Sequence, residues 1–294
     1  MNLVGGIEAG GTKFICVIAS GPGSVRSETE VPTTTPSETV DGVVAFFQPH
    51  LQRDHLAALG LASFGPLDLD RSSPTFGWIT TTPKAGWMNT NLPGRIADAL
   101  RLPVNVDTDV NAAALGEHRW GAAQGADPAV YITIGTGIGA GGVYNGKLMH
   151  GLVHPEAGHM RIPHDRSRDP FPGACPFHGD CLEGLASGPA MARRWGQKPE
   201  EIGRAHIAWE LEAHYIALGL VNLICSLSPR RIVVGGGVMR HEGLLDLVRK
   251  EVPKLLAGYI YSQVLQTRIH EYILPPAWET GRASWGRSRS HRTS

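Results

Sequence analysis

The chain has 294 residues, of which 42% are hydrophobic, and its 27 basic side chains balance 27 acidic ones. This length and apolar content predict a large core and two lobes. A formal net charge of zero disfavours a broad electrostatic surface for nucleic acid or for an anionic membrane. No apolar run reaches the roughly 20 residues of a membrane span, and no signal peptide is evident, so we expect a cytoplasmic protein.

Two short apolar runs near the N-terminus flank a Gly-rich turn. The turn, Glu8–Lys13, reads Glu-Ala-Gly-Gly-Thr-Lys, and the flanking runs predict a β-hairpin with a tip of mostly bare backbone. Backbone N–H groups, the Thr12 hydroxyl and the Lys13 ammonium at such a tip suit the phosphates of a nucleotide. Glu8 is a candidate ligand, direct or through water, for the Mg²⁺ that accompanies them. A purely structural tight turn explains the same residues equally well.

A second stretch repeats this pattern in the other half of the chain. Val130–Ile134 runs into the Gly/Thr-rich turn Gly135–Gly142, and an apolar pair follows. The glycines fit the dinucleotide motif G-x-G-x-x-G, but that motif requires a helix after them, and here a strand-like run follows. Two similar hairpins predict two related lobes that close on one nucleotide.

At these residues the sequence resembles the actin-like sugar kinases, and specifically the ROK family (repressor, open reading frame, kinase). Glu8–Lys13 is similar to the first phosphate motif of the family, Thr133–Gly141 to its second, and Arg231–Met239 to its adenosine motif. The resemblance implies an α/β, two-lobed actin-like (ribonuclease H-like) ATPase fold with nucleotide and sugar in the cleft between the lobes. We expect a small lobe at 1–118 and a large lobe at 119–276. The expected nucleotide-binding residues are Gly10, Gly11, Thr12, Lys13, Gly135, Thr136, Gly137, Gly235, Gly236 and Gly237.

An acidic segment follows the predicted strand Leu102–Val106 and opens a helix near Val110. Asp109 is predicted to cap this helix, which alone would explain an Asp here. The functional interpretation is that its carboxylate also takes the proton of the attacking sugar hydroxyl. The catalytic aspartate of the ROK family falls on Asp109, two residues before Asn111. Thr108 stands where the glucokinase-like pattern has Asn, which argues against glucose-type contacts.

Two segments of the first half are candidates for sugar binding. The predicted strand Ala57–Ala62 leads to Gly65-Pro66, and such a strand end faces a crevice in open α/β sheets, although an ordinary strand exit has the same pattern. Further on, Thr82-Pro83-Lys84 lies between Trp78 and Trp87 and offers donors and flat apolar faces. This segment resembles the Thr-Pro-Lys of ROK fructokinases rather than glucokinases. A solvated surface charge explains Lys84 equally well.

A Cys/His cluster occupies the loop at about 154–183. Cys175, His178 and Cys181 supply three zinc ligands within seven residues, and His159 can complete a tetrahedron, with His154 and His164 as substitutes. In the ROK family a His and three later Cys hold zinc, and His178 replaces one of those cysteines here. Four protein ligands predict a structural Zn²⁺ that fixes the loop. The alternative is a pair of free thiols and surface histidines.

The resemblance extends to sugar-binding carboxylates in the same loop. Glu156 and Glu183 match the sugar-binding glutamates of the family, and His159 is expected to touch sugar and metal together. Carboxylates suit sugar hydroxyls because each accepts two or more hydrogen bonds. The expected sugar-binding residues are Gly65, Thr82, Lys84, Asp109, Glu156, His159 and Glu183.

Periodicity predicts the remaining elements. The expected strands are Arg26–Val31 and Arg231–Val234, and the expected helices are Ser37–Phe47, Ser187–Trp195, Arg204–Leu227 and one from about Glu242.

The C-terminal segment differs in character from the rest. Ala277–Ser294 is rich in Arg, Ser, Gly and Trp without a helix or strand period, which predicts a disordered basic tail. The ROK resemblance implies an apolar helix there instead. We hypothesise that a frameshift near Pro276 replaced this helix with the basic segment.

Together these features predict ATP-dependent phosphorylation of a hexose, with D-fructose converted to D-fructose 6-phosphate and Asp109 as general base. The cofactors are Mg²⁺ with ATP and a structural Zn²⁺, and the partners are ATP, fructose and a second copy in a homodimer. The alternatives are a kinase for mannose, glucose or an N-acetylhexosamine, and a non-catalytic sugar-binding ROK protein. A ROK repressor requires an N-terminal helix-turn-helix, whereas this sequence starts on the first predicted strand.

Overall fold

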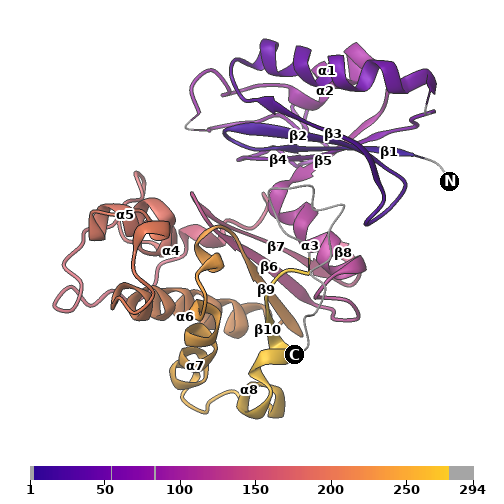
Figure 1. The fold of residues 1–294 in the computed structure, drawn as a ribbon. Helices are drawn as coiled ribbons and strands as arrows, with labels where there is room; N and C mark the ends of the chain where they lie inside the picture. Colours follow the sequence, from indigo (N-terminus) through magenta and orange to yellow (C-terminus); the bar gives the residue numbers. More distant parts are fainter. Residues whose placement is uncertain (1–2, 54, 83, 278–294) are drawn as a thin grey trace. The chain divides into compact units, whose positions relative to one another are not determined.

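A computed structural model describes residues 3–53, 55–82 and 84–277, so the predicted basic tail lies outside the described residues from position 278 onward. The described chain divides into two compact units (Figure 1). Unit 1 contains the residues up to Ala113 and the short segment His150–His154, and unit 2 contains Ala114–Met149 and Pro155–Pro276. Sequence analysis did not single out His150–His154 as a part of the first unit.

Unit 1 is built on a mixed five-stranded sheet in the order β3-β2-β1-β4-β5. β1 pairs antiparallel with β2 and parallel with β4, so the first two strands form the predicted hairpin. β2 is almost wholly apolar and buried, whereas the edge strand β3 alternates charged and less exposed side chains. The strands are β1 (Val4–Ala9), β2 (Lys13–Ala19), β3 (Val25–Pro32), β4 (Leu59–Ser63) and β5 (Val104–Thr108).

Helices α1 and α2 pack side by side in unit 1 (Figure 1). α1 begins with a capping box in which Thr35 and Glu38 exchange side-chain-to-backbone bonds, and it buries Val40, Val43 and Phe47 at helical spacing. The helix runs from Pro36 to Arg53 and is longer than the predicted helix over 37–47. The helices are α1 (Pro36–Arg53), α2 (Leu92–Leu100) and α3 (Asp109–Trp120), and the chain passes from unit 1 to unit 2 within α3.

Unit 2 repeats the sheet of unit 1, in the order β10-β9-β6-β7-β8. β6 pairs antiparallel with β7 and parallel with β9, as β1 does with β2 and β4. Both sheets therefore consist of three antiparallel strands followed by two parallel ones, which confirms the expectation of two related α/β units. The strands are β6 (Ala129–Ile134), β7 (Ile138–Tyr144), β8 (Lys147–Leu148), β9 (Arg231–Gly235) and β10 (Ile273–Leu274).

The helices of unit 2 lie mostly after the loop that carries the cysteines. α5 begins after Ser187, whose hydroxyl accepts from the Ala190 amide, and it agrees with the helix predicted over Ser187–Trp195. The predicted start of the long helix at Arg204 is wrong, because the helix begins at Ala208. The amide of Ala208 donates to the His206 ring. The elements are η1 (Ala157–His159), α4 (Leu182–Ala186), α5 (Gly188–Trp195), η2 (Pro199–Glu201), α6 (Ala208–Leu227), η3 (Val238–Arg240), α7 (Leu244–Leu256), α8 (Gln263–Thr267) and α9 (Ile269–Tyr272).

Helix α6 is long and apolar enough, by length and composition, to cross a membrane. Most of its side chains are nevertheless buried in the hydrophobic core of unit 2, and α7 packs beside it. A helix that is apolar on all sides is expected at the centre of a large core. α6 is therefore a core helix, which agrees with its interpretation from the sequence.

Candidate active site and metal centre

Three parallel strands of unit 1 end side by side. The last residue of β1, Ala9, is the register partner of Ser63 at the end of β4. Ser63 in turn is the register partner of Thr108 at the end of β5. The segments that follow them contain the Gly10–Thr12 turn, Gly65 and Asp109. Ligands of open α/β sheets bind at the carboxyl ends of strands. The structure therefore brings the predicted phosphate turn and the predicted catalytic aspartate to one edge of the sheet.

Glu8 and Asp109 lie within electrostatic reach of each other at this edge. Burial raises the pKa of Glu8, the negative charge of Asp109 raises it further, and Lys13 opposes both effects. A divalent cation would relieve the repulsion between the two carboxylates, and carboxylate oxygens are ligands that Mg²⁺ accepts. The residues present at this edge fit the predicted magnesium site.

The N-terminal cap of α3 differs from the prediction. The Thr108 hydroxyl accepts the Asn111 amide at 3.1 Å, so Thr108 is the cap and Asp109 is the first helical residue. The prediction that Asp109 caps the helix is wrong, because the Thr side chain one residue earlier already takes the amide that a cap satisfies. Asp109 instead accepts the amide of Val110 at 2.8 Å. Helix capping therefore does not account for an aspartate at this position.

The loop predicted to bind sugar in unit 1 is anchored by Trp87. This side chain is fully buried, its indole N–H donates to the Thr34 carbonyl, and it packs against Phe14 and Phe64. The prediction that Trp87 offers a flat face to a sugar is therefore wrong. Thr82 in the same loop is also buried. Lys84 reaches the first hairpin, where its ammonium donates to the Gly11 carbonyl at 2.6 Å.

A polar cluster beside Asp109 was not foreseen from the sequence. His150 Nε2 lies 2.9 Å from Asp107 Oδ2, and Asn111 Nδ2 donates to Asp107 Oδ1 at 2.8 Å. His154, in the same short segment, accepts the Leu67 amide through Nε2 at 3.4 Å. The two histidine contacts join positions 43 and 87 residues apart in the chain, so no local sequence signal indicated them.

In unit 2 the predicted sugar-binding residues gather around Ile138, the first residue of β7. Glu183 Oε2 accepts the Ile138 amide at 2.9 Å. A Cβ on Gly158 would lie 1.8 Å from the Ile138 carbonyl oxygen, so only glycine allows this approach. Gly158 lies in η1, which His159 ends and Glu156 precedes as the N-cap residue.

The glycines of the predicted adenosine motif lie beside the second hairpin. Gly235 ends β9 and is the register partner of Thr133 in β6. A Cβ on Gly236 would lie within 2.3 Å of the Ile134 backbone, and its φ of 99° also favours glycine. The Gly235–Gly237 segment and the Gly135–Gly137 turn are therefore neighbours at one edge of the unit 2 sheet.

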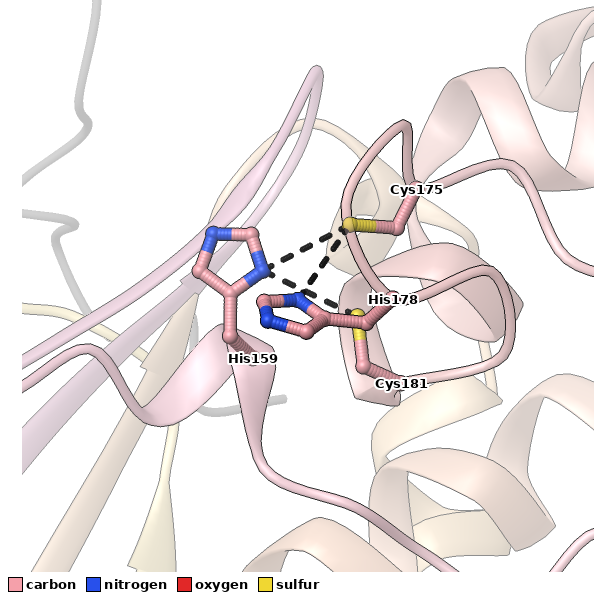
Figure 2. A group of neighbouring side chains, drawn as sticks. All are labelled: His159, Cys175, His178 and Cys181. Carbon is pink, nitrogen blue, oxygen red and sulfur yellow. Dashed lines mark hydrogen bonds between the residues drawn. The ribbon is translucent and has the colours of Figure 1, made fainter. Parts of the chain in front are cut away.

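His159, Cys175, His178 and Cys181 form the cluster that the sequence predicted (Figure 2). Their potential ligand atoms all lie within 4.8 Å of one another. His159 Nδ1 is 3.7 Å from both sulfurs, and Cys175 Sγ is 3.6 Å from His178 Nδ1. Zinc at ordinary bond lengths and tetrahedral angles separates sulfur from nitrogen by about 3.6 Å. The donor set and its spacing fit a four-coordinate zinc ion.

The two substitute histidines lie elsewhere. His154 bonds to Leu67 in unit 1, and His164 contacts Asp180 through Nδ1 and the Asp169 carbonyl through Nε2. Asp180 also pairs with Arg161 and Arg166, and Arg161 donates to the His178 carbonyl at 2.6 Å. These contacts hold the cysteine loop from outside. Among the candidate histidines, His159 is the one that faces both thiols.

The repeated strand order, with a Gly-rich hairpin opening each unit, is that of the actin-like ATPase fold. The solved structure of a ROK family glucokinase from Streptomyces griseus in complex with glucose and AMPPNP is similar to this chain, with a TM-score of 0.73, 27% identity and 97% of each chain covered. The profile of the ROK family matches residues 4–272, and the chain belongs to that family.

The sequence is also similar to proteins named fructokinases. A fructokinase from Zymomonas mobilis is 47% identical over 88% of this chain and 87% of that protein. A fructokinase from Lactococcus lactis is 42% identical over 96% of this chain and 94% of that protein.

Proposed function

We propose that this protein is a sugar kinase that transfers the terminal phosphoryl group of ATP to D-fructose and forms D-fructose 6-phosphate. The observation that carries the proposal is the register of Ala9, Ser63 and Thr108, which aligns the phosphate turn with Asp109 at one sheet edge. Fructose is favoured among hexoses because relatives named fructokinases are 42% and 47% identical, whereas the similar glucokinase structure is 27% identical.

Asp109 acts as the general base. Phosphoryl transfer depends on positioning, on neutralisation of phosphate charge and on a carboxylate that accepts the hydroxyl proton. Asp109 begins α3 directly after the cap residue Thr108, so its Cα is held by both the strand end and the helix. Hydrogen bonds from the protein to the sugar orient the attacking hydroxyl. The residues that supply them are Gly65, Thr82, Glu156, His159 and Glu183.

Glu8 and Asp109 lie where the Mg²⁺ of Mg·ATP would neutralise negative charge. The cation stabilises the charge of the transferring phosphate when it is bound. The glycines of both hairpins and of the Gly235–Gly237 segment provide backbone N–H groups for the nucleotide. Thr12, Lys13 and Thr136 add side-chain donors.

A zinc ion held by His159, Cys175, His178 and Cys181 would be structural, because four protein ligands leave no open coordination position. It fixes the loop between η1 and α4, which has few apolar side chains of its own. A cytoplasmic location without a nucleic acid or membrane partner is in keeping with cysteines that form no disulfide and with a formal net charge of zero. The homodimer is part of the same proposal.

A panel of sugars tests the proposal. ADP release with Mg·ATP is measured on fructose, mannose, glucose and N-acetylhexosamines, and kcat/KM is compared among them. We expect the highest kcat/KM on fructose. A higher value on another hexose reassigns the substrate, and sugar binding without ADP release on any of them identifies a non-catalytic sugar-binding protein.

A further inference from the structure

The ammonium of Lys84 contacts the nucleotide side of unit 1. Its Nζ lies 2.6 Å from the carbonyl oxygen of Gly11, at the tip of the β1–β2 hairpin. The two residues are 73 positions apart in the chain, so the contact depends on how the loop at 82–90 is held.

Trp87 holds that loop against one end of the sheet, where β2 begins and β3 ends. The Trp87 amide donates to the Lys84 carbonyl at 3.2 Å, and its indole donates to the Thr34 carbonyl just after β3. The Trp87 ring is fully buried and lies 5.6 Å from the ring of Phe14, which directly follows Lys13. A buried indole in a packed core has few alternative positions. The main chain at Lys84 is therefore fixed relative to the hairpin.

All the carbonyls of the hairpin tip are satisfied from within unit 1. Gly10 O accepts from the Thr33 hydroxyl at 2.8 Å, and Thr12 O from the Thr33 amide at 2.9 Å. Lys13 O accepts from the Gly10 amide at 3.0 Å, and Lys84 takes the remaining carbonyl, that of Gly11. Within the described part of the chain, the Gly11 and Thr12 amides donate to no protein acceptor. Such an arrangement of free N–H groups binds anions.

Lys13, the cation of the hairpin itself, is directed to the neighbouring strand. Its ammonium forms an ion pair with Glu30 on β3. The Lys84 ammonium has three donors, of which one goes to Gly11, so two are available to phosphate oxygens beside the free amides.

We propose that Lys84 is a nucleotide-side residue: it holds the Gly11–Thr12 turn in its anion-binding conformation and contacts the terminal phosphate of ATP. This inference rests on the proposed kinase function. It assigns the Lys84 side chain to the phosphates rather than to sugar hydroxyls.

Calorimetric titrations of the full-length protein distinguish a role of Lys84 in nucleotide binding from a role in sugar binding. A non-hydrolysable ATP analogue with Mg²⁺ is titrated without sugar, and fructose is titrated without nucleotide, into the wild type, Lys84→Met and Lys84→Arg. Lys250→Met is the matched control, because Lys250 is an exposed lysine on α7. We expect Lys84→Met to weaken binding of the ATP analogue roughly tenfold or more, with fructose affinity unchanged. Lys84→Arg retains most of the nucleotide affinity because it keeps the charge.

Steady-state kinetics provide the second readout, with KM for Mg·ATP raised and KM for fructose unchanged in Lys84→Met. A loss of fructose affinity with unchanged nucleotide affinity overturns the proposal, and so does wild-type nucleotide binding by Lys84→Met. Melting temperatures equal to that of the wild type show that the variants are folded. If the wild type binds the ATP analogue but phosphorylates no fructose, the substrate assignment fails while the comparison of nucleotide affinities still decides the role of Lys84.

Discussion

Glu183 and Ile138 join the cysteine loop of unit 2 to its β6–β7 hairpin. The carboxylate oxygen Oε2 of Glu183 accepts the Ile138 amide at 2.9 Å. Glu183 lies in α4 just after the thiol of Cys181, and Ile138 begins the second strand of the hairpin. One carboxylate oxygen therefore supports the hairpin, and the proposed contact with a sugar hydroxyl is assigned to the other.

Two substitutions of Glu183 separate these tasks. Glu183→Gln keeps a carbonyl oxygen for the Ile138 amide but removes the charge, so we expect weaker fructose binding and little change in nucleotide affinity. Glu183→Ala leaves the amide without its partner, at a cost of about 1 kcal/mol, and lowers nucleotide affinity about fivefold as well. Titrations of fructose and of an ATP analogue measure both effects, with the exposed Glu200→Ala as control. Equal nucleotide affinity in both Glu183 variants would contradict this coupling.

Zinc content and thermal stability depend on the Cys/His cluster. We expect one zinc per chain by elemental analysis, and its loss in Cys175→Ser, since the ligand set is incomplete without that thiolate. The melting temperature should fall by roughly 10 °C, which corresponds to about 3–4 kcal/mol. Cys225→Ser, which alters an exposed cysteine on α6, is the control and should keep both the zinc and the stability. A zinc-free wild type with unchanged melting after treatment with a chelator would exclude a structural metal.

Glu212 is a buried carboxyl group in the core helix α6, and we expect its ionisation to destabilise unit 2 at neutral pH. Both oxygens lack a hydrogen-bond partner among the described residues, and burial raises the pKa of Glu212 well above its usual value, although Arg194 opposes this. The folded state therefore favours the protonated form. The destabilisation is absent below a pH near the unfolded pKa and grows as the pH rises toward the folded pKa.

Replacing Glu212 with Gln removes this ionisation. We expect Glu212→Gln to melt above the wild type at pH 7–8, by about 2–4 °C for each kcal/mol recovered, and the difference to vanish near pH 4. Glu210→Gln changes an exposed carboxylate on the same helix and serves as the control. A difference that is independent of pH would show that packing rather than charge is responsible.

Thr108 supports Asp109 through the cap of α3. Thr108→Ala removes the hydroxyl that accepts the Asn111 amide, which costs about 1 kcal/mol of stability and lowers kcat because Asp109 follows directly. Thr108→Ser keeps the acceptor and should retain both properties. Chemical denaturation and steady-state kinetics measure the two effects. Equal behaviour of the Ala and Ser variants would show that the cap is not required.

Local patterns in the sequence predicted the elements that depend on neighbouring residues. The two hairpins follow from apolar runs around Gly-rich turns, and the metal cluster follows from ligand spacing within one loop. The repeated sheet follows from the two hairpins together with the ROK resemblance. Predicted helix starts failed where a side chain accepts a backbone amide near the first turn, as Thr108 does for Asn111 and His206 for Ala208.

Long-range contacts were beyond the sequence patterns. Trp87 is an aromatic residue of the type found at sugar-binding surfaces. It is buried here because it packs against Phe14 and bonds to Thr34, which lie far away in the chain. The Lys84–Gly11 bond and the His150–Asp107 pair likewise form only when distant segments meet. Periodicity carries no information on such pairs, because it reports only on the face of one element at a time.

The most direct measurement is the product formed from fructose and Mg·ATP by the wild type and by Asp109→Asn. Phosphorus NMR identifies the phosphorylated carbon, and ADP release gives the rate. The account predicts D-fructose 6-phosphate from the wild type and a rate roughly 10²- to 10⁴-fold lower in Asp109→Asn with fructose and nucleotide still bound. Asp98→Asn, at an exposed position on α2, should match the wild type. Undiminished turnover in Asp109→Asn, or no phosphorylated sugar from folded wild-type protein, would contradict the account.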